Sequence, residues 1–317
     1  MAPPRRACPC ARACFVLLLA LLPCCRVRRA GAQSQPADDK QLLLRIKSAW
    51  GDPPALAVWN ASSPGAPCAW TFVGCDTAGR VTNLTLGSAG VAGPFPDAVG
   101  GLSALTHLDV SNNSISGAFP TALYRCASLQ YLDLSQNKLT GELPVDIGRG
   151  LGANLSTLVL SNNQFNGSIP ASLSSLSYLQ HLTLDTNRFV GTVPPGLGSL
   201  TRLQTLWLAA NRFVPAELPA SFKNLTSIVS LWASQCNLTG GFPSYALEME
   251  ELEVLDLSNN MLTGSIPAGV WSLKNLQQLF LYDNNFSGDV PDLTQLRYFY
   301  ELDLSNNNFS GAFPEAV

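Results

Sequence analysis

The chain has 317 residues, of which 46% are apolar and 13% are charged, so it can bury a sizeable core. Its formal net charge is −3, and removing the six arginines of the first 32 residues leaves 13 basic residues against 22 acidic ones, a net charge of −9. This acidic balance argues against nucleic acid as a partner.

Residues 1–32 have the pattern of a secretory signal peptide. Basic residues precede the apolar run CFVLLLALLP, and the triplet AGA at 30–32 offers a small-residue cleavage site. Only uncharged residues lie between Arg12 and Arg26, but they span about 20 Å as a helix against a hydrocarbon core of roughly 30 Å. A membrane anchor is therefore the weaker reading. We expect a secreted chain that begins near Gln33 and has no membrane span.

The segment from Asp38 to Trp50 predicts the first helix. Its apolar residues recur at helical spacing, the aspartate at its start can cap the first turn, and Gly51 can end it. The chain from residue 81 onward repeats one pattern, described below, and the first coil of such a repeat domain needs a cover over its apolar edge. We expect this helix to provide that cover.

The segment PCAWTFVGC follows, and it resembles the CxWxGVxC signature that closes the N-terminal cap of plant leucine-rich repeat ectodomains. Phe72 stands where the family has glycine, which puts the local turn in doubt. The resemblance implies a disulfide between Cys68 and Cys75, which on the chain-entropy estimate contributes about 2.5 kcal/mol. A zinc site is the alternative, but two cysteines without a histidine supply too few ligands. Helix and loop together make residues 33–80 an N-terminal cap.

From residue 81 to residue 317 one pattern recurs ten times. Within 252–275, three leucines of L-x-x-L-x-L alternate as in a short strand, and Asn260 follows at a turn where its amide can bond backbone groups. Leucines equivalent to Leu255 recur at steps of 24, 24, 26, 24, 24, 25, 24, 24 and 23 residues. One coil cannot bury its apolar side alone, so the coils must stack and their strands must pair in parallel. These leucines are Leu84, Leu108, Leu132, Leu158, Leu182, Leu206, Leu231, Leu255, Leu279 and Leu302.

Each unit continues with a motif such as TGSIP, SGAFP, TGELP or NGSIP. Here the chain resembles the plant-type extracellular leucine-rich repeats of receptor kinases and receptor-like proteins, from Asp38 to Val317. The resemblance implies an α/β solenoid with a curved parallel β-sheet on the concave face. Its convex face should carry mainly short 3₁₀ helices and loops, with the helical cap at the N-terminal end. The chain has no V-A-I-K, H-R-D or D-F-G kinase motif, so the likeness is to the ectodomain only.

Two further cysteines and two insertions interrupt the regular pattern. Cys126 and Cys236 lie five coils apart, which places them about 24 Å from each other, beyond the reach of a disulfide. We expect both to be buried thiols. The insertions, RGLGAN at 149–154 and NRFVPAELP at 211–219, should form loops on the outer side.

Strand positions that cannot point inward must line the concave face, and the ligand-binding candidates come from them. Aspartates in LDLS segments are common scaffold in this family, whereas Trp207 and Trp232 replace polar residues in adjacent coils of a wet face. The two indoles should lie about 5 Å apart and form a flat apolar platform. The alternative is that they pack against each other or against a glycan. The candidate ligand-binding residues are His181, Asp185, Trp207, Trp232, Asp256, Phe280 and Tyr282.

Within the family the chain resembles receptors related to HAESA, which perceive small secreted peptides containing hydroxyproline. The segments NRFVPAELPASFKNL and LWASQCNLTG carry this likeness. It implies an extracellular or cell-surface receptor domain that binds an extended peptide along its concave face, with a co-receptor ectodomain as a second partner. The alternative is a stand-alone secreted protein, either an inhibitor of a microbial cell-wall hydrolase or a decoy. An enzyme ranks third, because His107 and His181 lie three coils apart without a nucleophile pattern, and no cofactor is expected.

Two expectations concern the surface and the C-terminal edge. No cap follows the tenth coil within the chain, so the last coils should fray or self-associate. An exported chain would be glycosylated at some of its Asn-x-Ser/Thr sites. These candidates are Asn60, Asn83, Asn112, Asn154, Asn166, Asn224, Asn237, Asn285 and Asn308.

Overall fold

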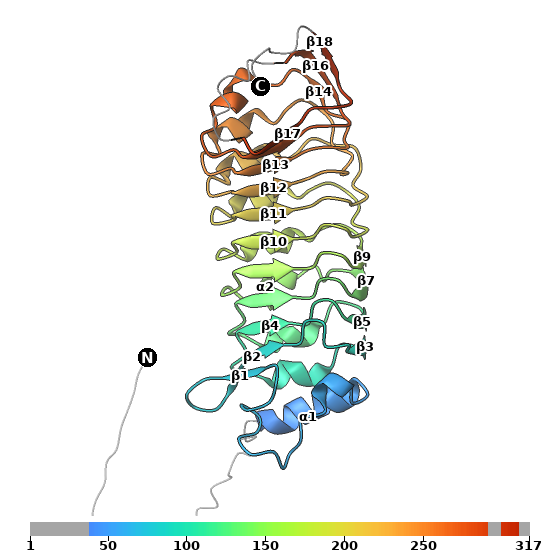
Figure 1. Cartoon of the computed structure of the whole chain (residues 1–317), viewed down its shortest axis with the longest axis vertical. Coiled ribbons are helices and arrows are strands. Elements are labelled where there is room, and N and C mark those ends of the chain that lie inside the picture. The colour runs from blue at the N-terminus through green and yellow to red at the C-terminus, as the bar shows by residue number, and fades with distance from the viewer. Residues whose placement is uncertain (1–37, 291–298, 311–317) are drawn as a thin grey trace, which may run out of the picture. The chain divides into compact units, whose positions relative to one another are not determined.

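The computed structural model describes residues 38–290 and 299–310. The expected signal peptide and the residues after 310 lie outside these ranges. The described coils stack along one axis, with short strands on one side and short helices on the opposite side (Figure 1). None of the helices within these ranges is both long enough and apolar enough to cross a bilayer.

The concave sheet confirms the predicted register of the repeats. Neighbouring strands pair in parallel, with Leu206 opposite Leu231 and Trp207 opposite Trp232. One strand of this sheet was not predicted: β1 (Val73–Cys75) pairs antiparallel with the first repeat strand. The parallel strands are β2 (Val81–Thr85), β4 (His107–Asp109), β6 (Tyr131–Asp133), β8 (Thr157–Val159), β10 (His181–Thr183), β11 (Thr205–Trp207), β12 (Ser230–Trp232), β13 (Val254–Asp256), β15 (Gln278–Phe280) and β17 (Glu301–Asp303).

The convex side is built mainly from one-turn 3₁₀ helices that follow a proline, as the fold assignment predicts. Proline suits the position before such a turn because its fixed φ starts the helix without needing a backbone donor. The insertion at 149–154 begins inside a short α-helix, α2 (Ile147–Gly150), on this outer side, and its last four residues form the predicted loop. The 3₁₀ helices are η1 (Pro54–Leu56), η2 (Asp97–Gly101), η3 (Thr121–Arg125), η4 (Ala171–Ser175), η5 (Pro195–Ser199), η6 (Ala220–Asn224), η7 (Ser244–Glu248) and η8 (Ala268–Ser272).

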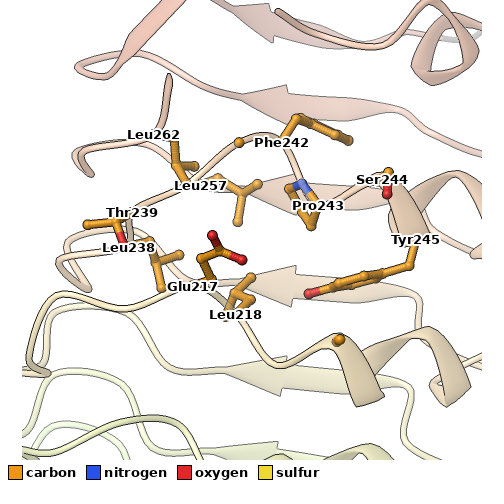
Figure 2. Close-up of a pocket in the computed structure, with 12 residues that line it drawn as sticks. Glu217, Leu218, Leu238, Thr239, Phe242, Pro243, Ser244, Tyr245, Leu257 and Leu262 are labelled. Carbon is orange, nitrogen blue, oxygen red and sulfur yellow. The ribbon is translucent and has the colours of Figure 1, made fainter. Parts of the chain in front are cut away.

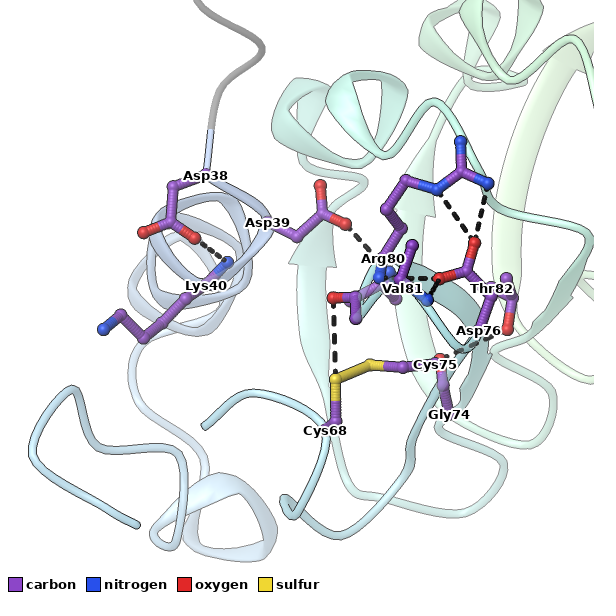
Figure 3. The surroundings of a disulfide bond; sticks show 12 residues. Asp38, Asp39, Lys40, Cys68, Gly74, Cys75, Asp76, Arg80, Val81 and Thr82 are labelled. Atoms are coloured by element: carbon purple, nitrogen blue, oxygen red, sulfur yellow. Dashed lines mark hydrogen bonds and ion pairs between the residues drawn. A yellow bond between two sulfur atoms is a disulfide. The ribbon is translucent and has the colours of Figure 1, made fainter. Parts of the chain in front are cut away.

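The N-terminal cap contains the predicted helix and the predicted disulfide (Figure 3). Asp38 accepts a hydrogen bond from the Lys40 amide at 3.0 Å and so caps α1 (Asp39–Ala49). Asp39 accepts a bond from the Val81 amide at 2.8 Å, which fastens the helix to the first coil.

The Cys68–Cys75 bridge closes the loop that follows the helix. Phe72 lies in this loop with φ of 73°, the left-handed region that favours the glycine of the family signature. The departure of Phe72 from the signature therefore leaves the backbone turn in place. Phe72 is half-buried and packs against the core, which offsets part of the conformational cost.

A ladder of buried asparagines joins one coil to the next. Asn187 shows the pattern: its Nδ2 donates to the carbonyls of Leu160, Leu184 and Asp185 at 3.0–3.2 Å, and its Oδ1 accepts from the Phe165 amide at 3.0 Å. These bonds satisfy backbone groups that the tight turn leaves unpaired. The same position in other coils is held by Asn113, Asn137, Asn163, Asn211, Asn260, Asn284 and Asn307.

Cys236 interrupts this ladder. It is buried and not disulfide-bonded, as is Cys126, which confirms the expectation for both thiols. The Cys236 thiol lies 3.3 Å from the Leu208 and Ser234 carbonyls, so it replaces part of the donor role of asparagine. It has no oxygen to accept from the Phe213 amide, which is the bond that each neighbouring asparagine would make.

A second, smaller sheet runs along one flank of the coils, and the sequence analysis did not predict it. It forms where the TGSIP-type motifs begin, and it is split into two blocks. Between the blocks only isolated bridges occur, among them Ala216 with Leu238 beside the insertion at 211–219. The blocks are β3 (Ala92–Pro94), β5 (Ser114–Gly117), β7 (Lys138–Glu142) and β9 (Gln164–Asn166), and then β14 (Thr263–Gly264), β16 (Asn285–Asp289) and β18 (Asn308–Ser310).

Candidate ligand-binding surface

A groove of about 760 Å³ crosses the concave sheet from β6 to β12, and we call it the central groove. Its position follows from the alternation of the strands, because residues on either side of each buried leucine face outward. Four predicted site residues lie in it together: His181, Asp185, Trp207 and Trp232. The full lining is Tyr131, Ser135, Gln136, Thr157, Val159, Ser161, Asn162, His181, Thr183, Asp185, Thr186, Thr205, Trp207 and Trp232.

The two indoles at one end of the groove do not form the flat platform that their spacing suggested. Their ring centroids are 5.5 Å apart, but the rings meet at 82°, edge to face. Hydrogen bonds fix this arrangement, since Trp207 Nε1 donates to Ser230 Oγ at 3.0 Å and Trp232 Nε1 donates to Ser234 Oγ at 2.6 Å. Both side chains are half-buried. The pair therefore forms an apolar corner rather than a plane.

Three of the predicted residues lie beyond the groove. Asp256 pairs in register with Trp232 and flanks the apolar corner, and Phe280 pairs in turn with Asp256. Tyr282 follows in the same coil as Phe280 and is half-buried. The predicted residues thus form two groups. Four lie in the central groove, and three lie in the next two coils beyond it.

The sequence analysis did not single out the hydroxyl groups that line the groove. Thr183 Oγ1 lies 2.8 Å from Ser161 Oγ, and Thr205 Oγ1 lies 3.0 Å from His181 Nδ1. All of these residues occupy outward strand or turn positions. The regular alternation would have placed them there, but small hydroxyl residues are so frequent in this chain that none stood out.

Aspartates of the LDLS segments confirm the scaffold role assigned to them. Asp133 Oδ1 accepts from the Ser135 amide at 2.8 Å, and Asp256 Oδ1 accepts from both the amide and the hydroxyl of Ser258. Asp109 and Asp303 accept from the serine amide two residues later in the same way. Each such bond closes a tight turn at the end of a strand.

Asp185 differs from these aspartates because it is only 3% exposed. Its carboxylate accepts bonds from the hydroxyls of Ser161 and Thr186, in place of the serine amide used elsewhere. Burial raises the pKa of Asp185 above 3.8, and the hydroxyl bonds oppose that rise only in part. Desolvation is also the main cause of the raised pKa values of Asp133 and Asp256.

Asp185→Asn is expected to remove part of the pH dependence of folding stability. Because the pKa of Asp185 is higher in the folded state than the ordinary 3.8, the folded protein takes up the proton first as the pH falls. The free energy of unfolding should therefore rise as the pH falls through the folded pKa toward 3.8, and this gain should be lost as the pH rises again. Urea denaturation of both proteins between pH 4 and pH 7 measures the difference. Identical pH profiles would contradict the assignment.

The concave face carries charge of one sign. No lysine or arginine occurs in the strands β2 to β17 of the concave sheet or in the four residues that follow each of them. The only groups there that can become cationic are His107 and His181. The acidic residues of this surface are Asp109, Asp133, Asp185, Asp256, Asp283, Glu301 and Asp303. Such a surface attracts cationic ligands and repels anionic ones.

The two histidines have structural partners rather than the geometry of a catalytic site. His107 stacks on Tyr131 with ring centroids 4.1 Å apart, while His181 contacts Thr205. In the described part of the chain, no three His, Cys, Asp or Glu side chains are grouped to hold a metal ion. An apolar corner beside hydroxyls and carboxylates is suited to binding.

Comparison with protein families matches most of this architecture. The leucine-rich repeat N-terminal domain matches residues 36–76. Leucine-rich repeat models match residues 79–139, 154–176, 178–200, 250–295 and 299–317, together more than half of the chain. The match thus includes both the cap with its disulfide and the stacked coils.

Individual relatives are polygalacturonase inhibitors and receptor kinases of plants. Polygalacturonase inhibitor 1 of Oryza sativa subsp. japonica is 40% identical over 94 residues, which are 29% of this chain and 28% of the inhibitor. The ectodomain of the Arabidopsis receptor kinase HAESA in complex with the IDA peptide hormone superposes with a TM-score of 0.82 at 36% identity. That match covers 87% of this chain and 46% of the HAESA chain, so this chain spans less than half of either relative. The chain belongs to the leucine-rich repeat family and has the fold of a plant receptor-kinase ectodomain.

Proposed function

We propose that the protein is an extracellular ligand-binding domain and that its central groove binds an extended, proline-containing peptide with basic flanking residues. Trp207 and Trp232 are the central anchors, with His181 and Asp185 on one side of them. Asp256, Phe280 and Tyr282 continue the surface on the other side. A proline or hydroxyproline ring fits the corner between the perpendicular indoles, and outward polar groups hold the peptide backbone.

The observation that carries this proposal is the paired indoles within a face that has carboxylates and no lysine or arginine. Two half-buried tryptophans side by side on a wet surface commonly mark an interaction site. The positions of the candidate glycosylation sites leave most of the concave face free for a ligand. Apart from Asn83 and Asn112 in the first two coils, they lie in the cap, on the convex side or on the flank.

Several comparisons support a peptide as the ligand. HAESA and GASSHO1/SCHENGEN3 are described in complex with a peptide hormone and with CASPARIAN STRIP INTEGRITY FACTOR 2, respectively, and this chain is 36% identical to each. HAESA also forms a complex that contains the co-receptor SERK1. We therefore propose a co-receptor ectodomain as a second partner.

A synthetic twelve-residue peptide with a central proline between two lysines should bind the purified protein, and the same peptide with glutamates in place of the lysines should not. The acidic concave face attracts the lysines and repels the glutamates, so we expect the Kd values of the two peptides to differ by at least about tenfold at low salt. This difference should become smaller as salt is added. Isothermal titration calorimetry at two salt concentrations measures both effects.

Asp256→Asn provides the internal test, because the amide retains the shape and the acceptor oxygen while the charge is lost. This variant should weaken binding of the lysine peptide but not of a neutral alanine-flanked peptide. Asp303→Asn, two coils away, should change neither. Tighter binding of the glutamate peptide would overturn the proposed ligand class.

An inhibitor of a microbial cell-wall hydrolase is the second candidate. It is favoured by the inhibitors from rice, pear and grape, which are 38–44% identical over segments of this chain. The two functions are separated by one assay. An inhibitor should reduce the activity of a fungal polygalacturonase at micromolar concentration, whereas a peptide-binding ectodomain should leave the activity unchanged.

A further inference from the structure

The junction between the sixth and seventh coils is the place where three regularities of the solenoid fail together. The step between Leu206 and Leu231 is 25 residues, and Cys236 replaces the ladder asparagine. The flanking sheet is also reduced here to the single bridge between Ala216 and Leu238. Along this flank one backbone hydrogen bond, from the Thr239 amide to the Ala216 carbonyl, joins the two coils, whereas two such bonds join the coils at each neighbouring junction. The sixth and seventh coils are therefore less tightly joined along this flank than their neighbours.

Tyr245 occupies this junction at a position that small residues hold in other coils. It is the second residue of η7, where η3 has Ala122, η4 has Ser172 and η8 has Gly269. The Tyr245 hydroxyl oxygen is buried but has no hydrogen-bond partner. A buried phenol without a partner is unfavourable, so this position calls for an explanation beyond packing.

A pocket of about 270 Å³ opens beside this tyrosine, and we call it the side pocket (Figure 2). The hydroxyl of Tyr245 and the carboxylate of Glu217 enter its space from opposite sides (Figure 2). Leu238, Leu257 and Leu262 are nearly fully buried and form an apolar floor. The remaining lining residues are Leu218, Ala220, Thr239, Gly241, Phe242, Pro243 and Ser244.

The chemistry of the side pocket selects for a positive charge. The Glu217 carboxylate is an acceptor, and no lysine, arginine or histidine lines the pocket with it. Its charge contributes, after desolvation, to raising the pKa of Tyr245, so the phenol stays neutral and keeps its proton. A primary ammonium group has three donors and can bond both the carboxylate and the phenol oxygen. The volume equals that of about nine water molecules at ~30 Å³ each.

We propose that the side pocket binds a small organic cation, a primary ammonium group on an apolar body, with about nine heavy atoms in all. The ammonium group lies between Glu217 and Tyr245, and the apolar body lies on the leucine floor. This site is on the flank of the solenoid and does not depend on peptide binding in the central groove.

Phenethylamine is a suitable probe, with 2-phenylethanol and 3-phenylpropionate as neutral and anionic counterparts of closely similar shape. Titration of the full chain, followed by saturation-transfer NMR, should give a Kd for the amine at least about tenfold lower than for either counterpart. Glu217→Gln and Tyr245→Phe should each weaken amine binding by about tenfold or more.

Glu142→Gln is the matched control, because Glu142 lies against Gly167 on the same flank as Glu217 lies against Gly240. Amine binding should be unchanged in this variant and also in Trp207→Ala with Trp232→Ala, which tests the central groove separately. Failure to bind the amine, equal affinity in Glu217→Gln, or a preference for the carboxylate probe would overturn the proposal.

Discussion

Replacing Trp207 and Trp232 together by alanine should weaken binding of the lysine-flanked proline peptide by at least roughly thirtyfold. Aromatic anchors at the centre of an interface typically cost about 2 kcal/mol or more when truncated. The side chains are half-buried and their indole N–H groups bond to serine hydroxyls rather than to the backbone of a neighbouring coil, so the solenoid should stay folded. Isothermal titration calorimetry gives the affinity, and circular dichroism checks the fold.

Thr85→Ala is the control for this experiment. Thr85 occupies the same outward column as Trp207, but it lies in β2, five coils from the indole pair. Its loss should change the Kd by less than about twofold. If the double tryptophan variant bound the peptide as tightly as the wild type, the indoles would be structural and the binding site would lie elsewhere.

Asn187→Ala should lower the free energy of unfolding by about 3 kcal/mol, the largest stability effect that we expect from one side chain on the concave side. The substitution removes three donated bonds and one accepted bond, and it leaves buried backbone groups without partners. Urea denaturation followed by circular dichroism measures this loss. A change below about 1 kcal/mol would show that water replaces the amide.

Two further substitutions complete this test, one at an asparagine outside the ladder as a control and one at the gap in the ladder. Asn275→Ala removes one exposed bond, from its Nδ2 to the Glu250 carbonyl, and should cost less than about 1 kcal/mol. Cys236→Asn is the reverse experiment, because an amide of similar volume would supply the missing acceptor for the Phe213 amide. It should raise the free energy of unfolding by about 1 kcal/mol. Destabilisation would mean that the seventh coil has adapted to the thiol.

Much of the fold could be predicted because the same pattern of leucines and asparagines recurs in most repeats of the sequence. The leucine spacing predicted the strand register, and the recurrent asparagine predicted bonds to the turn backbone. The second sheet was missed, although segments such as Lys138–Glu142 alternate exposed and buried residues. A two-residue alternation of this length is too short to distinguish a strand from an extended loop. Pairing with the coil above and below makes it a strand.

The position of the indole pair was predictable, but the arrangement of its rings was not. The alternation placed Trp207 and Trp232 on one face at the correct separation, and their perpendicular arrangement depends on bonds to Ser230 and Ser234 that no periodicity encodes. The burial of Asp185 was hidden for a similar reason. It follows from Ser161 in the preceding coil, 24 residues away in the chain.

The gap in the ladder at Cys236 lies between the same two coils that carry Trp207 and Trp232. A ligand bound to both indoles would contact the two coils on either side of this weakly joined junction. A ligand that binds only the folded state adds to its stability. With ligand bound, the coils before and after this junction should therefore unfold together as one cooperative unit.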